Sequence, residues 1–304
     1  MPEVAHRWGV ESLWQQLLPL LPGLSVEVVE RTVSTNSALL ERARVVSRPD
    51  PDDADVVIQR SVESRAFGRR STDVQPCLLV AEHQTGGRGR QGRAWHSARG
   101  ASLTFSLSLP LDLADWSGLS LAVGIAVADA LDPLAPGATP RIGLKWPNDL
   151  WLMDRFTPTE RRGRKLGGVL IETVAAGPRR LAVIGIGLNV LPMPDVEAST
   201  GVACVQELDP QADAPGVLAR IALPLVQMLK DFERTGFAPC VARFAARDLL
   251  AGQAVRTTSG AVAEGVAEGV DAQGALCVRT VDGLRQVTSG EVSVRLDPPS
   301  AGPS

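Results

Sequence analysis

The chain has 304 residues, of which 44% are hydrophobic, and this length is enough for one large domain and a smaller one. Its formal net charge of −3 gives no overall positive field, which argues against a protein that binds nucleic acid over a broad surface. The four cysteines lie far apart and form no C-x-x-C pair, so we expect reduced thiols, a cytoplasmic protein and no metal site.

The N-terminal part of the chain predicts a strand followed by a helix. Its first apolar run, residues 17–24, is interrupted by two prolines and is too short to span a membrane, so no membrane association is expected. The β-branched run Val26–Val29 predicts a strand, and the capping residues Ser34–Asn36 predict the start of a helix. Residues 44–75 mix charges, prolines and serines without a regular period, so we expect an inserted mobile loop there.

The central part predicts both strands and helices. Ser102–Leu109 alternates (SLTFSLSL), which is the pattern of a strand with one buried face, and residues 116–131 have the apolar spacing of a helix. IGLKWPNDLWL, residues 142–152, predicts two short strands around a Pro-Asn-Asp turn. The same patterns predict further strands at 77–81, 168–173 and 181–190, and helices at 217–233 and 241–250, with Pro224 as a kink or boundary and Gly252 as the end of the last helix.

Short strands that contain valine and are separated by turn residues begin at Gln253, which is typical of a small SH3-like β-barrel. We therefore predict an α+β fold: a domain of residues 1–250 with a mixed β-sheet flanked by helices, then a small C-terminal β-barrel at 251–297. Residues 298–304 form a tail that is too short and too rich in proline and glycine to fold.

The segment GGRGRQGRAW, residues 86–95, is the first candidate binding element. Its glycines allow positive φ and a close approach of the backbone to a ligand, and Arg88 and Arg90 would point to the same side of an extended segment. Arginine forks match phosphate and carboxylate groups, so we expect an anion site. The alternative is a flexible arginine-glycine arm, but the flanking predicted strands place the segment inside a fold. No phosphate-loop or dinucleotide-binding pattern is present.

Two further motifs each bring a lysine near a turn or a glycine pair. In KWPNDLW, residues 145–151, Pro147 fixes the chain direction and places Lys145 and Asp149 near one turn; the alternative is a hairpin tip with a surface ion pair. In RKLGGVLIE, residues 164–172, Lys165 precedes two glycines that open a buried strand; the alternative is a solvated lysine at a strand entry.

The fourth motif, IGIGLNV at residues 184–190, places two glycines on one face of a strand. Gly185 and Gly187 leave a slot in which a flat ligand could lie, with Asn189 on the same side. The alternative is that the glycines accommodate a neighbouring helix.

These four motifs in this order, preceded by Ser34-Thr35-Asn36, resemble the biotin protein ligase family. The resemblance covers residues 34–190 and extends more loosely to the small C-terminal domain that ends in SGEVSVR. It implies an enzyme that activates biotin with ATP and Mg²⁺ to biotinyl-5'-AMP and then transfers biotin to a lysine of a biotin carboxyl carrier protein domain, as found in acetyl-CoA carboxylase. The chemistry agrees with the motifs, because two anions must be brought together and cations must offset their repulsion.

The resemblance also implies roles for individual residues. The residues expected to bind biotin are Ser34, Thr35, Asn36, Gln84, Gly87, Arg88, Gly168, Gly185 and Gly187. Those expected to bind ATP or the adenylate are Arg88, Arg90, Arg93, Trp95, Lys165 and Asn189. Those expected to act in catalysis are Lys165, Arg90, Asp149 and Lys145, where Asp149 is either a general base or only orients the incoming lysine, and an ordinary structural turn remains the alternative for it.

Two departures from the family pattern are visible. Only about thirty residues precede Ser34, too few for the DNA-binding domain of bifunctional relatives, so no DNA binding is expected. The spacer MDRFTPTERRG, residues 153–163, is longer than in the family, and its arginines are either a solvated hairpin or contacts to substrate phosphates or the carrier.

Three rival functions stay open at this point. A lipoate or octanoate protein ligase shares the fold of the biotin ligases, a non-catalytic biotin-sensing regulator would keep the pocket, and an RNA-binding module would use the arginine-glycine segment. The oligomeric state is not fixed by the sequence, and a homodimer is allowed.

Overall fold

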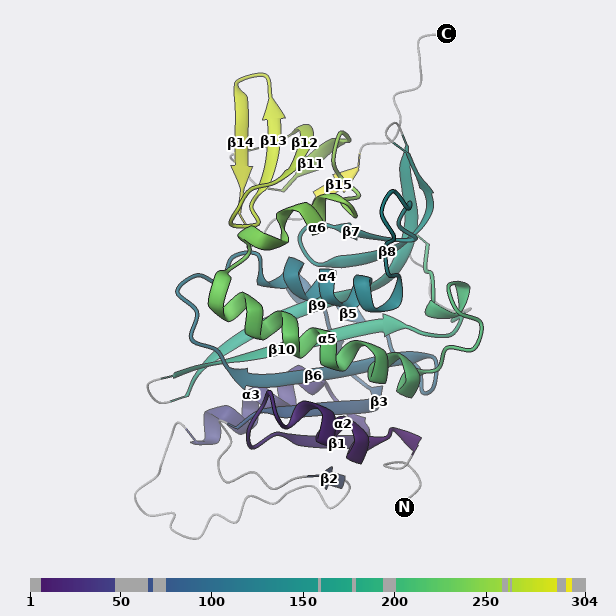
Figure 1. Cartoon of the computed structure of the whole chain (residues 1–304), viewed down its shortest axis with the longest axis vertical. Coiled ribbons are helices and arrows are strands. Elements are labelled where there is room, and N and C mark those ends of the chain that lie inside the picture. Colours follow the sequence, from purple (N-terminus) through teal and green to yellow (C-terminus); the bar gives the residue numbers. More distant parts are fainter. Residues whose placement is uncertain are drawn as a thin grey trace. The chain divides into compact units, whose positions relative to one another are not determined.

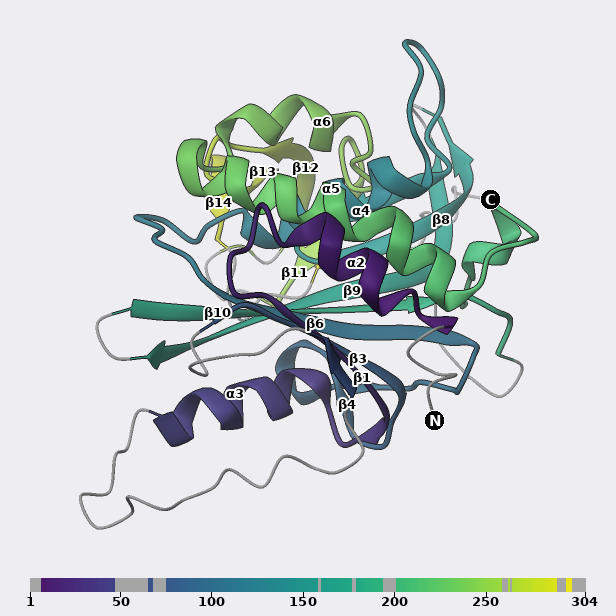
Figure 2. The same ribbon diagram turned by 60° about the horizontal axis from the view of Figure 1, so that its bottom comes forward.

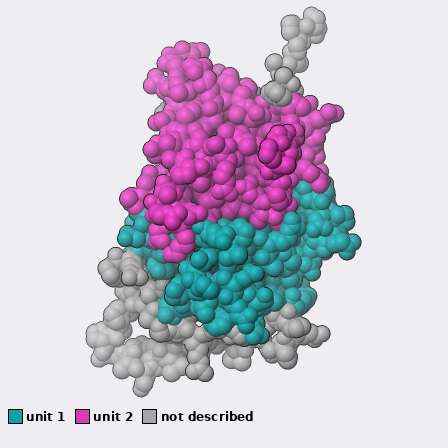
Figure 3. All heavy atoms as spheres, viewed as in Figure 1, with its two compact units in different colours: residues 1–113, 167–227 teal, residues 114–166, 228–304 magenta. Residues whose placement is uncertain are grey.

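The computed structural model describes residues 7–46, 65–67, 75–157, 160–176, 179–193, 201–258, 262, 264–288 and 294–296. These residues belong to two compact units, which Figure 3 shows in different colours. Unit 1 comprises Met1–Leu113 and Gly167–Gln227, and unit 2 comprises Ala114–Leu166 and Met228–Ser304. Most of the insertion predicted at 44–75, and the whole tail at 298–304, lie outside the described residues.

Unit 1 is built on a mixed β-sheet. Its strand order is β2-β1-β3-β6-β10-β9, in which β1 and β3 run parallel and the other neighbours run antiparallel. The strands are β1 (Ser25–Thr32), β2 (Arg65–Phe67), β3 (Cys77–Gln84), β6 (Ser102–Pro110), β9 (Arg161–Ala176) and β10 (Arg179–Asn189), and β9 begins in unit 2.

Helices cover both faces of this sheet. Helix α2 (Val10–Leu17) packs on β1, and helix α3 (Thr35–Val46) packs on β3, β6 and β10, on the opposite side (Figures 1 and 2). The predicted start of α3 is confirmed, because the Ser34 hydroxyl accepts the Ser37 N–H at 3.4 Å. Helix α3 packs on the sheet through Leu39 and Leu40, which lie in one hydrophobic core with Leu79.

Strand β6 differs from its sequence prediction. Eight of its nine residues are buried, so both faces are covered and not only one. The hydroxyl positions of the alternating pattern are buried because partners are available: Thr104 Oγ1 donates to the Ala81 carbonyl at 2.9 Å, and Ser106 contacts the first turn of α3. Serine and threonine side chains are small enough to fit between the sheet and a helix, and their hydroxyl groups find hydrogen-bond partners there.

Unit 2 combines a helix-covered hairpin with a second sheet. Helix α4 (Leu119–Leu131) packs on the hairpin of β7 (Ile142–Lys145) and β8 (Asp149–Phe156), and β8 is followed in the sheet by β9. The second sheet is antiparallel, with the order β14-β13-β12-β11-β15. Its strands are β11 (Ala254–Thr257), β12 (Glu264–Val270), β13 (Leu276–Thr280), β14 (Gly283–Val287) and β15 (Val294–Leu296). The predicted α+β class, a mixed sheet with flanking helices followed by a small β domain, is confirmed.

Two helix predictions need correction. Helix α5 (Ala214–Thr235) contains Pro224 in its interior, so this proline does not bound it. The helix predicted at 241–250 ends early: α6 covers only Val241–Ala245, and Gly252, at φ +78°, bonds to the Ala267 carbonyl instead of ending a helix. The chain leaves the helix because the fully buried Arg247 guanidinium donates to Asp129, Asp132 and the Ile142 carbonyl. Two further short helical turns are η2 (Val205–Glu207) and η3 (Ala238–Cys240).

No helix among the described residues is long and apolar enough to cross a membrane.

Candidate active site

The glycine-arginine segment forms a small hairpin at the end of β3. Strand β4 (Gly87–Arg88) pairs with β5 (Ala94–Trp95) around the 3-10 turn η1 (Arg90–Gly92). The segment is therefore not extended throughout. The expectation that Arg88 and Arg90 point to the same side assumed an extended segment, and Arg90 instead begins η1. Positive φ occurs at Gln91 and, among the four glycines of the segment, only at Gly92. Gly87 is needed for space instead, because a Cβ there would lie 2.5 Å from the Trp95 carbonyl oxygen.

A buried polar network joins α3 to β3 and β6. The Thr35 backbone N–H and hydroxyl both lie within hydrogen-bond distance of Gln84 Oε1, at 2.7 and 3.2 Å. Ser106 Oγ lies 2.6 Å from Thr35 Oγ1 and 2.6 Å from Asn36 Oδ1. The structure thus brings Ser34, Thr35, Asn36 and Gln84 together, and it adds Ser106, which we did not predict.

The slot at Gly185 is occupied by a side chain of the protein. A Cβ on Gly185 would lie 2.3 Å from Asn36 Oδ1, so the missing side chain makes room for helix α3, the alternative left open above. Asn36 Nδ2 also donates to the Leu170 carbonyl at 3.2 Å and to Glu172 Oε2 at 2.9 Å. The amide of Asn36 is thus used within the protein, where it fixes the helix on the sheet.

Trp95 fills the space at Gly187. A Cβ on Gly187 would lie 2.5 Å from Cε2 of the Trp95 ring, and one on Gly87 would lie 3.2 Å from Trp95 Cδ1. The indole Nε1 is buried and has no hydrogen-bond partner among the described residues. Trp95, which we predicted near adenine, therefore lies against two glycines that we predicted near biotin.

The other predicted residues of unit 1 have these positions. Gly168 of β9 is the register partner of Gly187. Asn189 is buried and its Nδ2 donates to the Ala203 carbonyl at 3.1 Å. Arg88 is bound to Glu172, and Arg93, just after η1, is exposed.

The lysine motifs of unit 2 form an ion pair. Lys165 Nζ lies 2.7 Å from Asp149 Oδ1, and the two side chains are 35% and 24% exposed. Lys145 and Asp149 occupy paired positions at the ends of β7 and β8, and Lys145 Nζ lies 4.7 Å from the centroid of the Trp151 ring. The turn between them is held by Trp146, whose buried Nε1 donates to the Gly274 carbonyl at 3.0 Å. The pair is thus part of an ordered, partly buried hairpin end.

Two family models match this sequence. Residues 64–189 match the Biotin/lipoate A/B protein ligase family, and residues 251–295 match the Biotin protein ligase C terminal domain. The biotin--[acetyl-CoA-carboxylase] ligase of Mycobacterium tuberculosis is 31% identical over 290 residues, which cover 93% of this chain and 91% of the relative. The chain belongs to the biotin protein ligase family. The bifunctional ligase/repressor BirA of Escherichia coli is 32% identical over 92% of this chain and 77% of its own length.

Solved structures agree with this ligase in fold. The biotin protein ligase of Aquifex aeolicus, solved in complex with biotin and ATP, has a TM-score of 0.65 at 23% identity and covers 90% of this chain and 99% of its own. The enzyme of Leishmania major, solved with biotinyl-5-AMP, has a TM-score of 0.51 at 19% identity, covering 87% of this chain and 98% of its own. The family and the enzyme class predicted from the four motifs, a biotin ligase, are confirmed.

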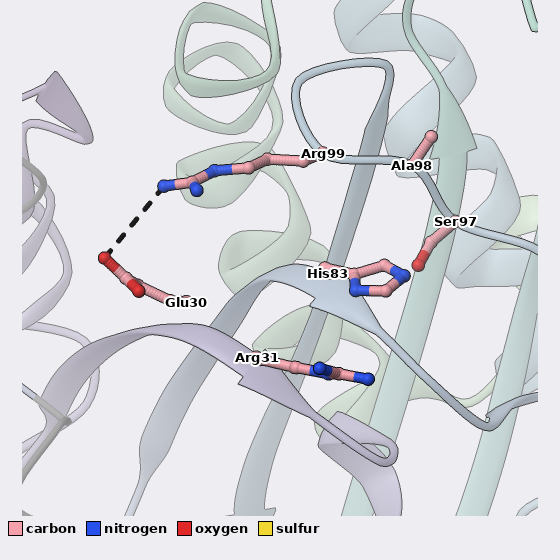
Figure 4. A pocket seen from close by; sticks show the side chains of 6 residues that line it. All are labelled: Glu30, Arg31, His83, Ser97, Ala98 and Arg99. Atoms are coloured by element: carbon pink, nitrogen blue, oxygen red, sulfur yellow. Dashed lines mark ion pairs between the residues drawn. The ribbon is translucent and has the colours of Figure 1, made fainter.

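A separate pocket of about 380 Å³ in unit 1 is lined by residues of β1, of β3 and of the segment between β5 and β6 (Figure 4). It is lined by Glu30, Arg31, His83, Ser97, Ala98 and Arg99, with Arg99 at 4.0 Å from Glu30. None of the predicted site residues lines it. Its link to the site is Ser97, whose hydroxyl accepts the Gln84 N–H at 2.9 Å and donates to the Gln84 carbonyl at 3.2 Å.

Sequence reasoning missed Ser97, Ser106 and Glu172. Ser106 was visible as one of several alternating hydroxyls in a strand, and Glu172 as the last letter of RKLGGVLIE. Neither carried a local signal, because the groups they bind are 70 to 136 residues away in sequence.

Proposed function

We propose that this chain condenses biotin with ATP to biotinyl-5'-AMP and then transfers biotin to a lysine of a biotin carboxyl carrier protein domain. The observation that carries the proposal is the convergence of the Thr35–Gln84 network with Trp95 at Gly87 and Gly187. The family of the chain supports it, and so does the name of the Mycobacterium tuberculosis relative.

The biotin end of the site needs polar partners for a buried urea and a flat apolar surface for its rings. Thr35 and Gln84 are buried polar residues at the C-terminal end of β3, and the Trp95 ring is the flat apolar surface beside them. A ligand or site group left without a hydrogen bond there would cost about 1–3 kcal/mol, which lets the pocket discriminate against acids without the urea, such as lipoate. We therefore place Ser34, Thr35, Gln84, Gly87, Trp95 and Gly168 at biotin.

In the first step a biotin carboxylate oxygen bonds to the α-phosphorus of ATP, and the bond to the β-phosphate oxygen breaks, so that pyrophosphate leaves. Two unit charges about 4 Å apart repel by about 4 kcal/mol at an effective dielectric constant of about 20. We assign Arg90, Arg93 and Lys165 to offset this repulsion, with Asn189 toward the adenine. No covalent enzyme intermediate is required.

In the second step the carrier lysine amine attacks the anhydride carbonyl and AMP leaves. The amine must lose a proton, and we assign Asp149 to accept or direct it. The 2.7 Å pair of Asp149 and Lys165 links the group proposed for this step to the one proposed for the first. Lys145, at the paired position, adds positive charge beside Asp149.

We propose that Mg²⁺ accompanies ATP on its phosphates. The described residues contain no group of three or more His, Cys, Asp or Glu side chains that could hold a metal ion. When bound, Mg²⁺ would offset the charge of the phosphates. The carrier domain, the cytoplasmic location, the absence of DNA binding and a homodimer remain predictions.

The test uses purified chain with biotin, ATP and MgCl₂. Biotin-dependent exchange of pyrophosphate into ATP and label transfer to a carrier domain should both occur, and octanoate or lipoate supporting exchange as well as biotin would overturn the choice of substrate. Lys165→Ala should slow single-turnover adenylate formation at least about a hundredfold and change the biotin Kd less than about threefold, because the amine acts where charge develops. Lys230→Ala, which removes a partly exposed lysine of α5 that pairs with Glu233, is the control.

A further inference from the structure

Glu172 binds both the glycine-arginine segment and helix α3. Its Oε2 accepts Arg88 Nη2 at 2.9 Å and Asn36 Nδ2 at 2.9 Å, and its Oε1 accepts Arg88 Nη2 at 3.1 Å. The side chain is 26% exposed, compared with 42% for Arg88. One carboxylate therefore connects the hairpin β4–β5 to the first turn of α3.

The carboxylate of Glu172 lies within the sheet and beside a side chain that has further partners. Glu172 lies in the interior of β9, paired with Val183 of β10. Asn36, its second partner, is held by Ser106 at 2.6 Å and by the Leu170 carbonyl at 3.2 Å. Its other partner, Arg88, belongs to the two-residue strand β4 of the hairpin.

The charge of Arg88 is used by this contact. Nη2 is shared between both oxygens of Glu172, and no carboxylate other than Glu172 pairs with Arg88 among the described residues. A guanidinium already neutralised by a carboxylate offers less attraction to a second one. The ion pair between Arg88 and Glu172 therefore fixes the position of the glycine-arginine segment and leaves Arg88 less able to attract a bound anion.

We propose that Glu172 is a positioning residue: through Arg88 it holds the glycine-arginine hairpin against the sheet, so that the hairpin retains the bound biotinyl adenylate until the carrier lysine arrives. This inference rests on the proposed function. It assigns the Arg88 side chain to the hairpin and leaves contact with the substrate phosphates to Arg90 and Arg93.

The test measures release of preformed adenylate into solution by a chase with unlabelled biotin, together with single-turnover adenylate formation. Glu172→Gln keeps an oxygen for Asn36 and removes the charge, and Arg88→Ala removes the other partner while leaving the Asn36–Glu172 contact in place. Both variants should release adenylate roughly tenfold faster, since a charge-assisted hydrogen bond that is partly exposed is worth about that factor. Glu172→Gln should also form adenylate at saturating substrate within about threefold of the parent rate.

Arg88→Lys keeps the positive charge and should recover most of the retention that Arg88→Ala loses, but only while Glu172 carries its carboxylate. The control is Asp154→Asn, which breaks the 3.0 Å ion pair between Asp154 of β8 and Arg164 of β9 and should leave release unchanged. Raising the salt concentration should speed release from the parent and not from Glu172→Gln.

Three results would overturn the inference: unchanged release from Glu172→Gln, release from Arg88→Lys that is as fast as from Arg88→Ala, or a loss of more than about a hundredfold in adenylate formation with Arg88→Ala, which would place the guanidinium on the substrate. A parent protein that forms no adenylate would instead reject the proposed function.

Discussion

The backbone space at Gly87 limits what the glycine-arginine hairpin tolerates. A Cβ at Gly87 would lie 2.5 Å from the Trp95 carbonyl, a backbone atom in the pairing of β4 and β5, whereas one at Gly89 would have its nearest neighbour, the Arg93 carbonyl, at 3.5 Å. Gly87→Ala should therefore raise the biotin Kd at least about tenfold and Gly89→Ala less than about threefold. Calorimetric titration checks this, and equal effects would mean that the hairpin shifts freely.

A second residue-scale consequence concerns Asp248, a fully buried carboxyl of unit 2. Burial raises its pKa from 3.8 to about 6, and the hydrogen bond from the Leu250 N–H opposes this only in part. Because the folded state favours the neutral form, the contribution of Asp248 to the free energy of unfolding is greatest below pH 3.8 and is lost as the pH rises through about 6. The whole loss is about 3 kcal/mol.

Asp248→Asn isolates this effect, since the amide resembles the protonated acid. The variant should gain stability relative to the parent as the pH rises, by about 1 kcal/mol between pH 5 and pH 7.5. Urea denaturation at a series of pH values measures the difference. A gap that stays constant with pH would show that Asp248 does not titrate in this range.

At the scale of elements, β6 supports the first turn of α3. Ser106 and Ser108 lie on the same face of this strand, but Ser106 Oγ is 2.6 Å from Thr35 Oγ1, whereas Ser108 Oγ is 3.5 Å from the Cys77 carbonyl. Ser106→Ala should raise the biotin Kd about tenfold, because Thr35 and Asn36 lose a shared partner, and Ser108→Ala should change it less than about twofold. The comparison fails if both serines behave alike in a fluorescence titration.

The elements that could be predicted from the sequence are those with local causes. The start of α3 follows from Ser34, and the turn between β7 and β8 from Pro147, because capping groups and fixed φ act within a few residues. The early end of α6 could not be predicted, since it depends on Arg247 reaching Asp129, 118 residues away. The site followed the same rule: motif residues were found, and Ser106 and Glu172 were not, because their roles are set by tertiary partners.

At the scale of the whole molecule, composition along the chain marks a change near residue 251, yet compactness groups Met228–Ser304 with Ala114–Leu166. The contacts behind this grouping join distant segments: Trp146 Nε1 donates to the Gly274 carbonyl, and Gly274 packs on Gly118 at the start of α4. In unit 2 the C-terminal sheet therefore supports the turn that carries Asp149. Such support leaves no periodic signal in the sequence.

Gly274 and Gly283 give a matched test of this support within the C-terminal sheet. Both have positive φ, +81° and +109°, so alanine at either position brings similar backbone strain, about 1 kcal/mol. Only Gly274 is also crowded, because a Cβ there would lie 2.7 Å from the Gly118 Cα, whereas nothing lies within 4 Å of one at Gly283. Gly274→Ala should therefore lower the free energy of unfolding by about 1–3 kcal/mol more than Gly283→Ala, as measured by urea denaturation. It should also slow transfer to the carrier more than adenylate formation, because the displaced sheet removes the acceptor of Trp146 beside the turn that precedes Asp149. Equal free energies of unfolding for the two variants would contradict this prediction. They would show that the contact between Gly274 and Gly118 does not stabilise unit 2.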